Sequence, residues 1–225
     1  MLMFDTQAIN LSIEILAAAI LVTAFLIVSS RSLLFYVRLF GVQSFLLGLV
    51  AVVVAIGFGE RHILIAALLT IGVKAIAIPY VLNKIIERIK VHKEIEFNLN
   101  ITTSLLICGL LVILADSVGK PIIDAEQMNA LPVSKVLPES IAMMMIGLFI
   151  MLARKQAVSQ IIGLLTLENG LFLSGLSITY GMPLIVEIGI FFDILVATMI
   201  LGVFVFRINQ TFDSINVDAL RRLKH

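Results

Sequence analysis

Five ionisable side chains lie inside hydrophobic stretches of the sequence, where charged residues are rare: Glu14, Lys74, Glu168, Glu187 and Asp193. A charge at the centre of a membrane-spanning helix costs about 2.5–3.5 kcal/mol even on insertion scales, so such groups usually face protein or water. Because a low dielectric favours the neutral forms of acids and amines, groups in this setting can take up and release protons. The pattern predicts movement of protons or cations across a membrane.

These five positions differ in depth. Glu14 and Glu187 lie near the ends of their hydrophobic stretches, within reach of lipid headgroups, so an ordinary interfacial role is the alternative. Lys74, Glu168 and Asp193 lie near the middle, where the alternative is a buried structural ion pair. Glu187 and Asp193 are expected about 9 Å apart along a helix and about 120° around it, as successive stations along one helix.

The neighbours of Lys74 and Glu168 favour a polar pocket. Pro79 follows Lys74 by five residues and removes the backbone donor that the carbonyl of Ala75 would use, which predicts a kink beside the lysine. Glu168 is followed by Asn169, whose amide can hold water, and then by small residues that let another helix approach closely. These small residues are Gly170, Ser174, Gly175 and Ser177.

Composition places the chain in the membrane class. Its 225 residues are 60% hydrophobic and 14% charged, and the mean hydropathy is +1.13, which predicts an all-α integral membrane protein that contacts the lipid bilayer. Lysine plus arginine (16) nearly equals aspartate plus glutamate (15), so we expect no nucleic-acid partner. Cys108 is the single cysteine and the three histidines lie outside the hydrophobic stretches, so we expect no metal or other cofactor in this chain.

Hydrophobic stretches of sufficient length predict seven transmembrane helices. The expected spans are 9–29, 39–58, 63–82, 99–115, 139–153, 159–179 and 184–206. The fifth is short and begins beside Pro138, so it either borrows residues from its flanks or crosses only in part.

The distribution of basic residues predicts the orientation. With the N-terminus out and the C-terminus in, twelve lysines and arginines lie in inner segments and three in outer segments, as the positive-inside rule requires. The outer three are Arg61, Lys120 and Lys135.

The chain is expected to form a single membrane domain, 1–225, with four parts. Residues 1–98 hold three spans and a charged segment, 83–98, predicted to be a helical extension at the inner interface. Residues 99–138 hold the fourth span and a long outer loop, 116–138, in which Pro121, Pro132 and Pro138 argue against regular structure. Residues 139–206 hold three spans, and 207–225 form a cytoplasmic tail.

Several sequence blocks together resemble component E of the hydrogenase-4 (formate-hydrogenlyase-like) complexes over the whole chain. The blocks are Gln43-Ser44, Lys74 with Pro79, Glu168-Asn169-Gly170, residues 184–190 leading to Asp193, and residues 216–220. Each block alone is weak evidence for the family. The resemblance rests on all the blocks together, in this order and on seven expected spans.

The last three spans also resemble the small three-span subunit K of respiratory complex I and its counterpart in multisubunit sodium/proton antiporters. In subunit K two membrane carboxylates on neighbouring helices are taken to carry protons. Asp193 matches the later one, as Asp in place of Glu. Glu168 lies about one turn beyond the earlier one when Asn169 is aligned with that family's Asn. Lys74 and Glu14 have no counterpart in the three-span subunit.

The resemblance implies a non-catalytic membrane subunit of a group 4 nickel–iron hydrogenase or complex-I-like complex in the plasma (inner) membrane of a prokaryote. Its implied partners are an antiporter-like proton-pumping subunit and the hydrogenase membrane anchor subunit. The nickel–iron centre and iron–sulfur clusters would belong to other chains. The expected proton pathway uses the side chains of Asp193, Glu168, Lys74, Glu187, Asn169 and Glu14.

Two alternatives remain open from the sequence. The chain could be a passive scaffold or anchor whose buried charges pair structurally and hold neighbouring subunits. It could also be a freestanding cation or proton transporter, although that class favours internal repeats with broken helices at matching positions.

Overall fold

The computed structural model describes residues 6–59, 61–89, 100–125, 134–154 and 156–179, and these residues form helices without a strand. The predicted seventh span, with Glu187 and Asp193, and the predicted tail lie outside the described residues. The helices are α1 (Thr6–Ser29), α2 (Leu33–Phe58), α3 (Arg61–Leu69), the π-helix η1 (Thr70–Ala77), α4 (Ile78–Ile89), α5 (Ile101–Ala125), the short 3₁₀ helix η3 (Ser134–Val136), α6 (Leu137–Ala153) and α7 (Ala157–Thr179).

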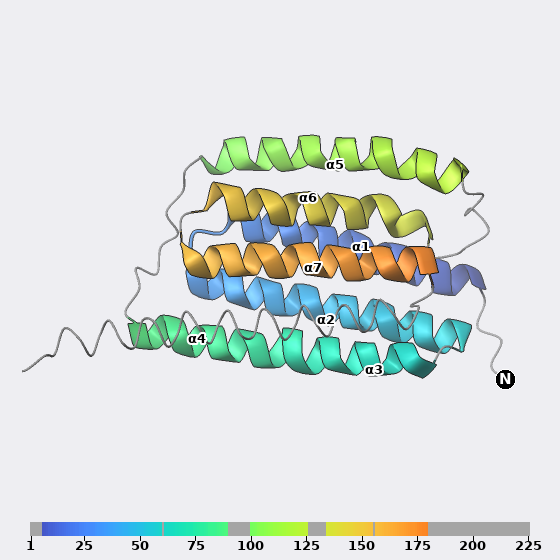
Figure 1. Ribbon diagram of the computed structural model, residues 1–225, viewed down its shortest axis with the longest axis horizontal. Coiled ribbons are helices and arrows are strands. Elements are labelled where there is room, and N and C mark those ends of the chain that lie inside the picture. Colours follow the sequence, from blue (N-terminus) through green and yellow to red (C-terminus); the bar gives the residue numbers. More distant parts are fainter. Residues whose placement is uncertain (1–5, 60, 90–99, 126–133, 155, 180–225) are drawn as a thin grey trace, which may run out of the picture.

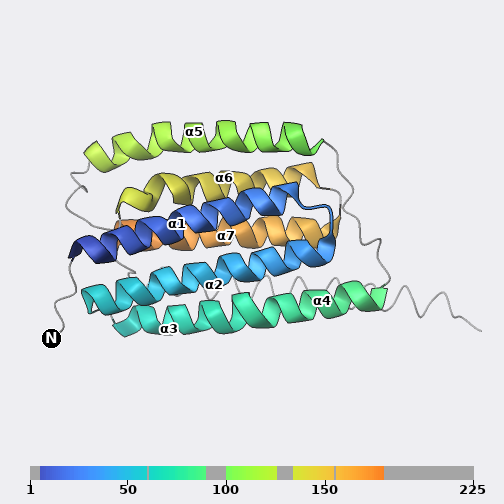
Figure 2. The ribbon, with the colours of Figure 1, turned by 180° about the vertical axis from the view of Figure 1, so that it is seen from behind.

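The long helices run side by side in an up-and-down bundle (Figure 1). α3, η1 and α4 follow one another as a single rod on one side of the bundle, and α5 lies on the opposite side (Figures 1 and 2). α1, α2, α6 and α7 lie between them. We call the end of the bundle that holds residues 29–33, 89, 101, 153, 154 and 157 the Arg154 end, and the other, with residues 58, 59, 61 and 134–137, the Lys135 end.

Six stretches of the described residues are long and apolar enough to cross a membrane. Each has at least 20 residues, with mean hydropathy between 1.6 and 2.6. They match the first six predicted spans, as expected for a multi-pass membrane protein. α7 is the most enclosed, with 72% of the residues of its apolar stretch buried, whereas only 17% of those in the apolar stretch of α5 are buried. α7 is therefore the helix on which buried polar groups are best shielded from lipid.

The prediction of an irregular outer loop from residue 116 is wrong for residues 116–125. α5 continues to Ala125 with Pro121 inside it. Ile123 is buried and packs with Leu137 and Ile141 at the start of α6. This tertiary packing holds the last turns of α5 in helical form although Pro121 removes one backbone hydrogen bond.

Two further boundaries differ from the sequence-based expectation. The fifth span gains length at its start, because η3 runs directly into α6 and Pro138 occupies the first turn, where a proline needs no donor. The segment predicted to lie along the inner interface from residue 83 instead continues the α3–η1–α4 rod as far as Ile89 (Figure 1). Ile85 and Ile86 pack into the core, which directs α4 along the bundle.

Glycines bring α6 and α7 into backbone contact. A Cβ atom on Gly147 of α6 would lie 2.5 Å from the Leu167 nitrogen of α7, and one on Gly170 would lie 2.8 Å from the Met144 nitrogen. One on Gly163 would lie 3.0 Å from the Gly147 oxygen. Small residues at a membrane helix interface allow this approach, and at Gly170 the structure confirms the close packing expected of the Gly/Ser run.

We predict that Gly147→Ala lowers the midpoint of thermal unfolding in detergent, because its methyl group would meet the α7 backbone. Gly109→Ala on α5 is the matched control, since a Cβ there meets nothing within 4 Å. The measurement is labelling of Cys108, the single cysteine and fully buried, by a thiol-reactive dye during heating. Equal midpoints for both variants would contradict the packing.

Candidate functional site

Lys74 and Glu168 form an ion pair in the interior of the bundle. The distance from Lys74 Nζ to Glu168 Oε1 is 2.8 Å, and each side chain is 3% exposed. Lys74 belongs to the α3–η1–α4 rod and Glu168 to α7, each near the middle of its helix. The sequence predicted both as deep charges, and the structure brings them together.

The segment that carries Lys74 is π-helical. Residues Thr70–Ala77 form η1, and the Ile78 nitrogen donates to the Val73 oxygen, five residues back. Pro79 follows directly and has no amide hydrogen to continue an α-helical ladder at this point. Where the sequence predicted a kink beside Lys74, the structure has a π-helical segment, and the α3–η1–α4 rod continues through it (Figure 1). π-helical insertions within α-helices are found frequently at functional sites.

Glycines of α2 allow close contact with this segment. A Cβ on Gly41 would lie 3.2 Å from both the Ala75 oxygen and Pro79 Cγ. A Cβ on Gly48 would collide with the Ile71 side chain. Because Gly41 and Gly48 lie on either side of Gln43 and Ser44, the same stretch of α2 supports η1 and provides polar groups.

A buried hydrogen-bonded chain lies beside the ion pair. Asn169 Nδ2 on α7 donates to Ser44 Oγ at 3.1 Å and to Gln43 Oε1 at 3.4 Å. Gln43 Nε2 in turn donates to the Ile20 oxygen of α1 at 3.5 Å. Gln43, Ser44 and Asn169 are each 0% exposed. Since Asn169 adjoins Glu168, the polar interior extends from η1 through α7 and α2 to α1.

Glu14 does not join this interior. Its Oε1 lies 3.2 Å from Lys135 Nζ at the Lys135 end, and the side chains of Glu14 and Lys135 are 40% and 62% exposed. This placement is that of the interfacial residue considered as the alternative. Glu187 and Asp193 fall outside the described residues.

A third buried charged residue, Arg154, is one of the twelve basic residues that the sequence places in inner segments. It is 2% exposed, and its Nη2 donates to the Val28 oxygen near the end of α1 at 2.6 Å. The guanidinium also lies beside the side chains of Tyr36 and Cys108. A cation at a helix C-terminus is favoured by the helix dipole. The sequence offers no signal for this burial, because Arg154 stands next to Lys155 at the end of a span.

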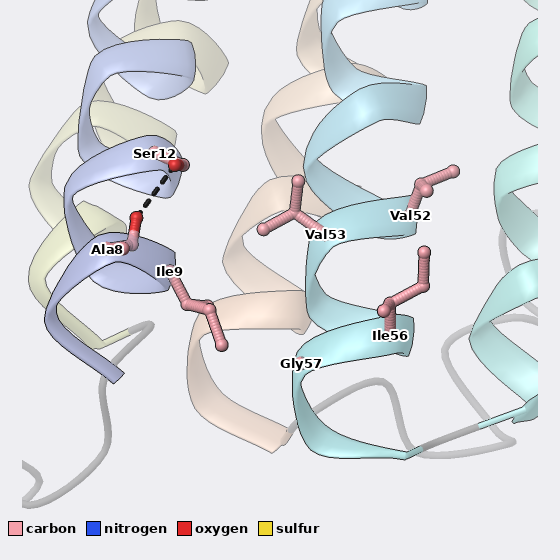
Figure 3. Close-up of a pocket in the computed structure, with 7 residues that line it drawn as sticks. All are labelled: Ala8, Ile9, Ser12, Val52, Val53, Ile56 and Gly57. Carbon is pink, nitrogen blue, oxygen red and sulfur yellow. Dashed lines mark hydrogen bonds between the residues drawn. The ribbon is translucent and has the colours of Figure 1, made fainter. Parts of the chain in front are cut away.

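An apolar groove lies at the Lys135 end between α1 and α2 (Figure 3). Its lining residues are Ala8, Ile9, Ser12, Val52, Val53, Ile56 and Gly57. The one hydroxyl among them, that of Ser12, donates to the Ala8 oxygen of its own helix at 2.7 Å. The groove therefore offers no titratable group and is separate from the ion pair. Within the described ranges, no three His, Cys, Asp or Glu side chains gather where they could hold a metal ion.

Comparison with known proteins gives one informative similarity. The chain is similar to a Mycobacterium tuberculosis protein described as "Uncharacterized protein Rv0085", with 28% identity over 216 residues that cover 96% of this chain and 97% of that protein. No protein-family model matches the chain, and no solved structure matches it. The similarity extends over the full span of helices and carries no statement of activity.

We predict that Lys74→Met destabilises the protein by about 3–5 kcal/mol, because it leaves the Glu168 carboxylate without its buried counter-charge. Adding Glu168→Leu should recover most of that loss, since the double variant removes both charges. The measurement is thermal unfolding by Cys108 labelling.

Lys120→Met provides the matched control for this cycle. Lys120 pairs with Asp116 at the same 2.8 Å distance, but the two side chains are 67% and 46% exposed, so its loss should leave the unfolding midpoint nearly unchanged. Additive effects of Lys74→Met and Glu168→Leu would contradict a direct pair.

Proposed function

We propose that this protein is a membrane subunit of a group 4 nickel–iron hydrogenase or related complex-I-like complex, and that its buried ionisable residues take part in proton translocation coupled to the redox reaction. The single observation that carries the proposal is the Lys74–Glu168 ion pair, buried at mid-bundle on a π-helical segment. The sequence resemblance to hydrogenase-4 component E supplies the context.

An ion pair of this kind is suited to a change in the ionisation of its members. Desolvation of two charges is costly, and their attraction offsets that cost only while the geometry is close. A third charge that approaches either partner, or a small movement of η1, changes the balance between the desolvation cost and the attraction of the two charges. Such a change favours proton uptake or release at Glu168. In the proposed pathway Lys74 is the switching charge, and Glu168 and Asp193 are the proton-carrying pair on neighbouring helices. Glu187 would be an outer station.

The proposed setting follows from the charge distribution and the resemblance. The N-terminus would face outward, and the Arg154 end would face the cytoplasm, because Arg31 lies between α1 and α2 at that end, and Arg38 and Lys84 lie toward that end of their helices. The seventh span would bring the C-terminus to the same side. The chain would lie in a prokaryotic inner membrane between an antiporter-like pumping subunit and the hydrogenase membrane anchor, which hold the other parts of the pathway. The nickel–iron centre and iron–sulfur clusters would reside in partner chains.

One observation also favours a second candidate, a passive scaffold. Lys74 and Glu168 satisfy one another within the chain, which is what a purely structural pair would do. If the chain is a scaffold, neutralising either residue would disturb assembly, whereas in the proposed function it would uncouple proton movement in an assembled complex.

We predict that Glu168→Gln lowers redox-driven proton uptake into membrane vesicles by about tenfold or more, because the amide keeps the shape of the side chain and cannot carry a proton. The measurement is uptake by vesicles that contain the assembled complex, with a native gel to establish assembly. Asp116→Asn, which neutralises the carboxylate of an exposed ion pair, should leave uptake unchanged.

Normal uptake by an assembled Glu168→Gln complex would contradict a role for this carboxylate in translocation. Loss of the complex from the gel would support the scaffold instead.

A further inference from the structure

Three buried hydroxyls on these helices hydrogen-bond to their own helix, whereas those of Ser104, Ser159 and Thr166 have no partner among the described residues. Thr23, Ser140 and Ser177 each donate to a carbonyl oxygen three residues back, at 2.6–2.7 Å. This local bond is the common solution for a hydroxyl in an apolar setting. Thr166 Oγ1 on α7 has no hydrogen-bond partner among the described residues, although the side chain is 0% exposed.

Asn169 presents a second polar atom of this kind. Its Nδ2 donates hydrogen bonds to Gln43 and Ser44, but its Oδ1 has no hydrogen-bond partner in the part of the chain that the structure describes. Turning the amide over exchanges the two atoms and still leaves one end without a partner. A buried polar atom left in this state is costly, and native proteins usually satisfy it with protein or with ordered water.

The three-residue spacing of Thr166 and Asn169 on α7 allows one small molecule to bond to both atoms. Residues three apart on a helix share a face, with Cβ atoms about 5–6 Å apart, and a water molecule with two hydrogen bonds of about 2.8 Å spans such a gap. Ile162, one turn before Thr166, and Leu173, one turn after Asn169, are both 0% exposed and apolar. They place apolar side chains on either side of the Thr166–Asn169 pair along this face of α7.

We propose that Thr166 and Asn169 bind an internal water molecule beside the contact of Asn169 with α2, within one helical turn, along α7, of the Lys74–Glu168 ion pair. The water donates a hydrogen bond to Asn169 Oδ1. With the Thr166 hydroxyl it forms a second hydrogen bond, in which either group can be the donor. The site itself does not depend on the function of the protein. Its use as a proton step next to Glu168 rests on the proposed function, and in that step the water accepts one proton and releases another, so that it is regenerated.

The test is Thr166→Val, which removes the hydroxyl and keeps the shape. If the site holds water, the variant loses a hydrogen bond, and the unfolding midpoint should fall by about 2–4 °C for a chain of this size. If the site is dry, removing an unpartnered hydroxyl should raise the midpoint, and that result would overturn the proposal. Thr23→Val is the control, because its hydroxyl already donates to its own helix.

A second measurement decides the matter if Thr166→Val fails to fold. An experimental structure of the full protein, at a resolution that shows ordered water, should contain density within hydrogen-bond distance of both Thr166 Oγ1 and the Asn169 amide. A site without such density would contradict the proposal. Both results are independent of the Glu168→Gln uptake experiment, so failure of the water site and failure of the proposed function remain distinguishable.

Discussion

Two opposite charges, Lys74 and Glu168, meet in the interior of an otherwise apolar helical bundle. Either charge alone is costly there, because lipid and apolar side chains offer no compensation. The packing of the surrounding helices holds these two side chains together. α7 is the most enclosed helix, the glycines of α6 and α7 bring their backbones together, and the glycines of α2 let η1 approach closely enough to support Lys74. A change that separates these helices by even a small distance would expose an uncompensated charge.

Much of the fold is predictable because membrane-spanning helices follow simple length and hydropathy rules. The first six spans, the depth of Lys74 and Glu168, and the disturbed helix before Pro79 all follow from local sequence. The continuation of α5 through Pro121 does not, since it depends on Ile123 packing against residues of α6. Local rules treat a proline as an interruption, and only tertiary contacts reveal where the helix continues.

Which residues of the site contact one another was less predictable than which residues belong to it. Hydropathy gives the depth of a residue but not the side of the helix that meets a given neighbour, so the sequence did not indicate that Lys74 meets Glu168, or that Asn169 meets Gln43 and Ser44. The burial of Arg154 was missed for a related reason. A basic residue at the end of a span usually extends to the headgroups, and only the fold shows that this one turns inward to the Val28 carbonyl.

The most direct test of the proposed role is the ionisation of Glu168 during turnover, observed by infrared difference spectroscopy of the assembled complex in membranes. We expect a carboxylate in the resting state, paired with Lys74, and a protonated carboxyl band that appears when the redox reaction is driven and is absent from Glu168→Gln. A Glu168 that remains ionised throughout turnover, with identical difference spectra for the wild type and the variant, would contradict that role and leave the pair with a structural one.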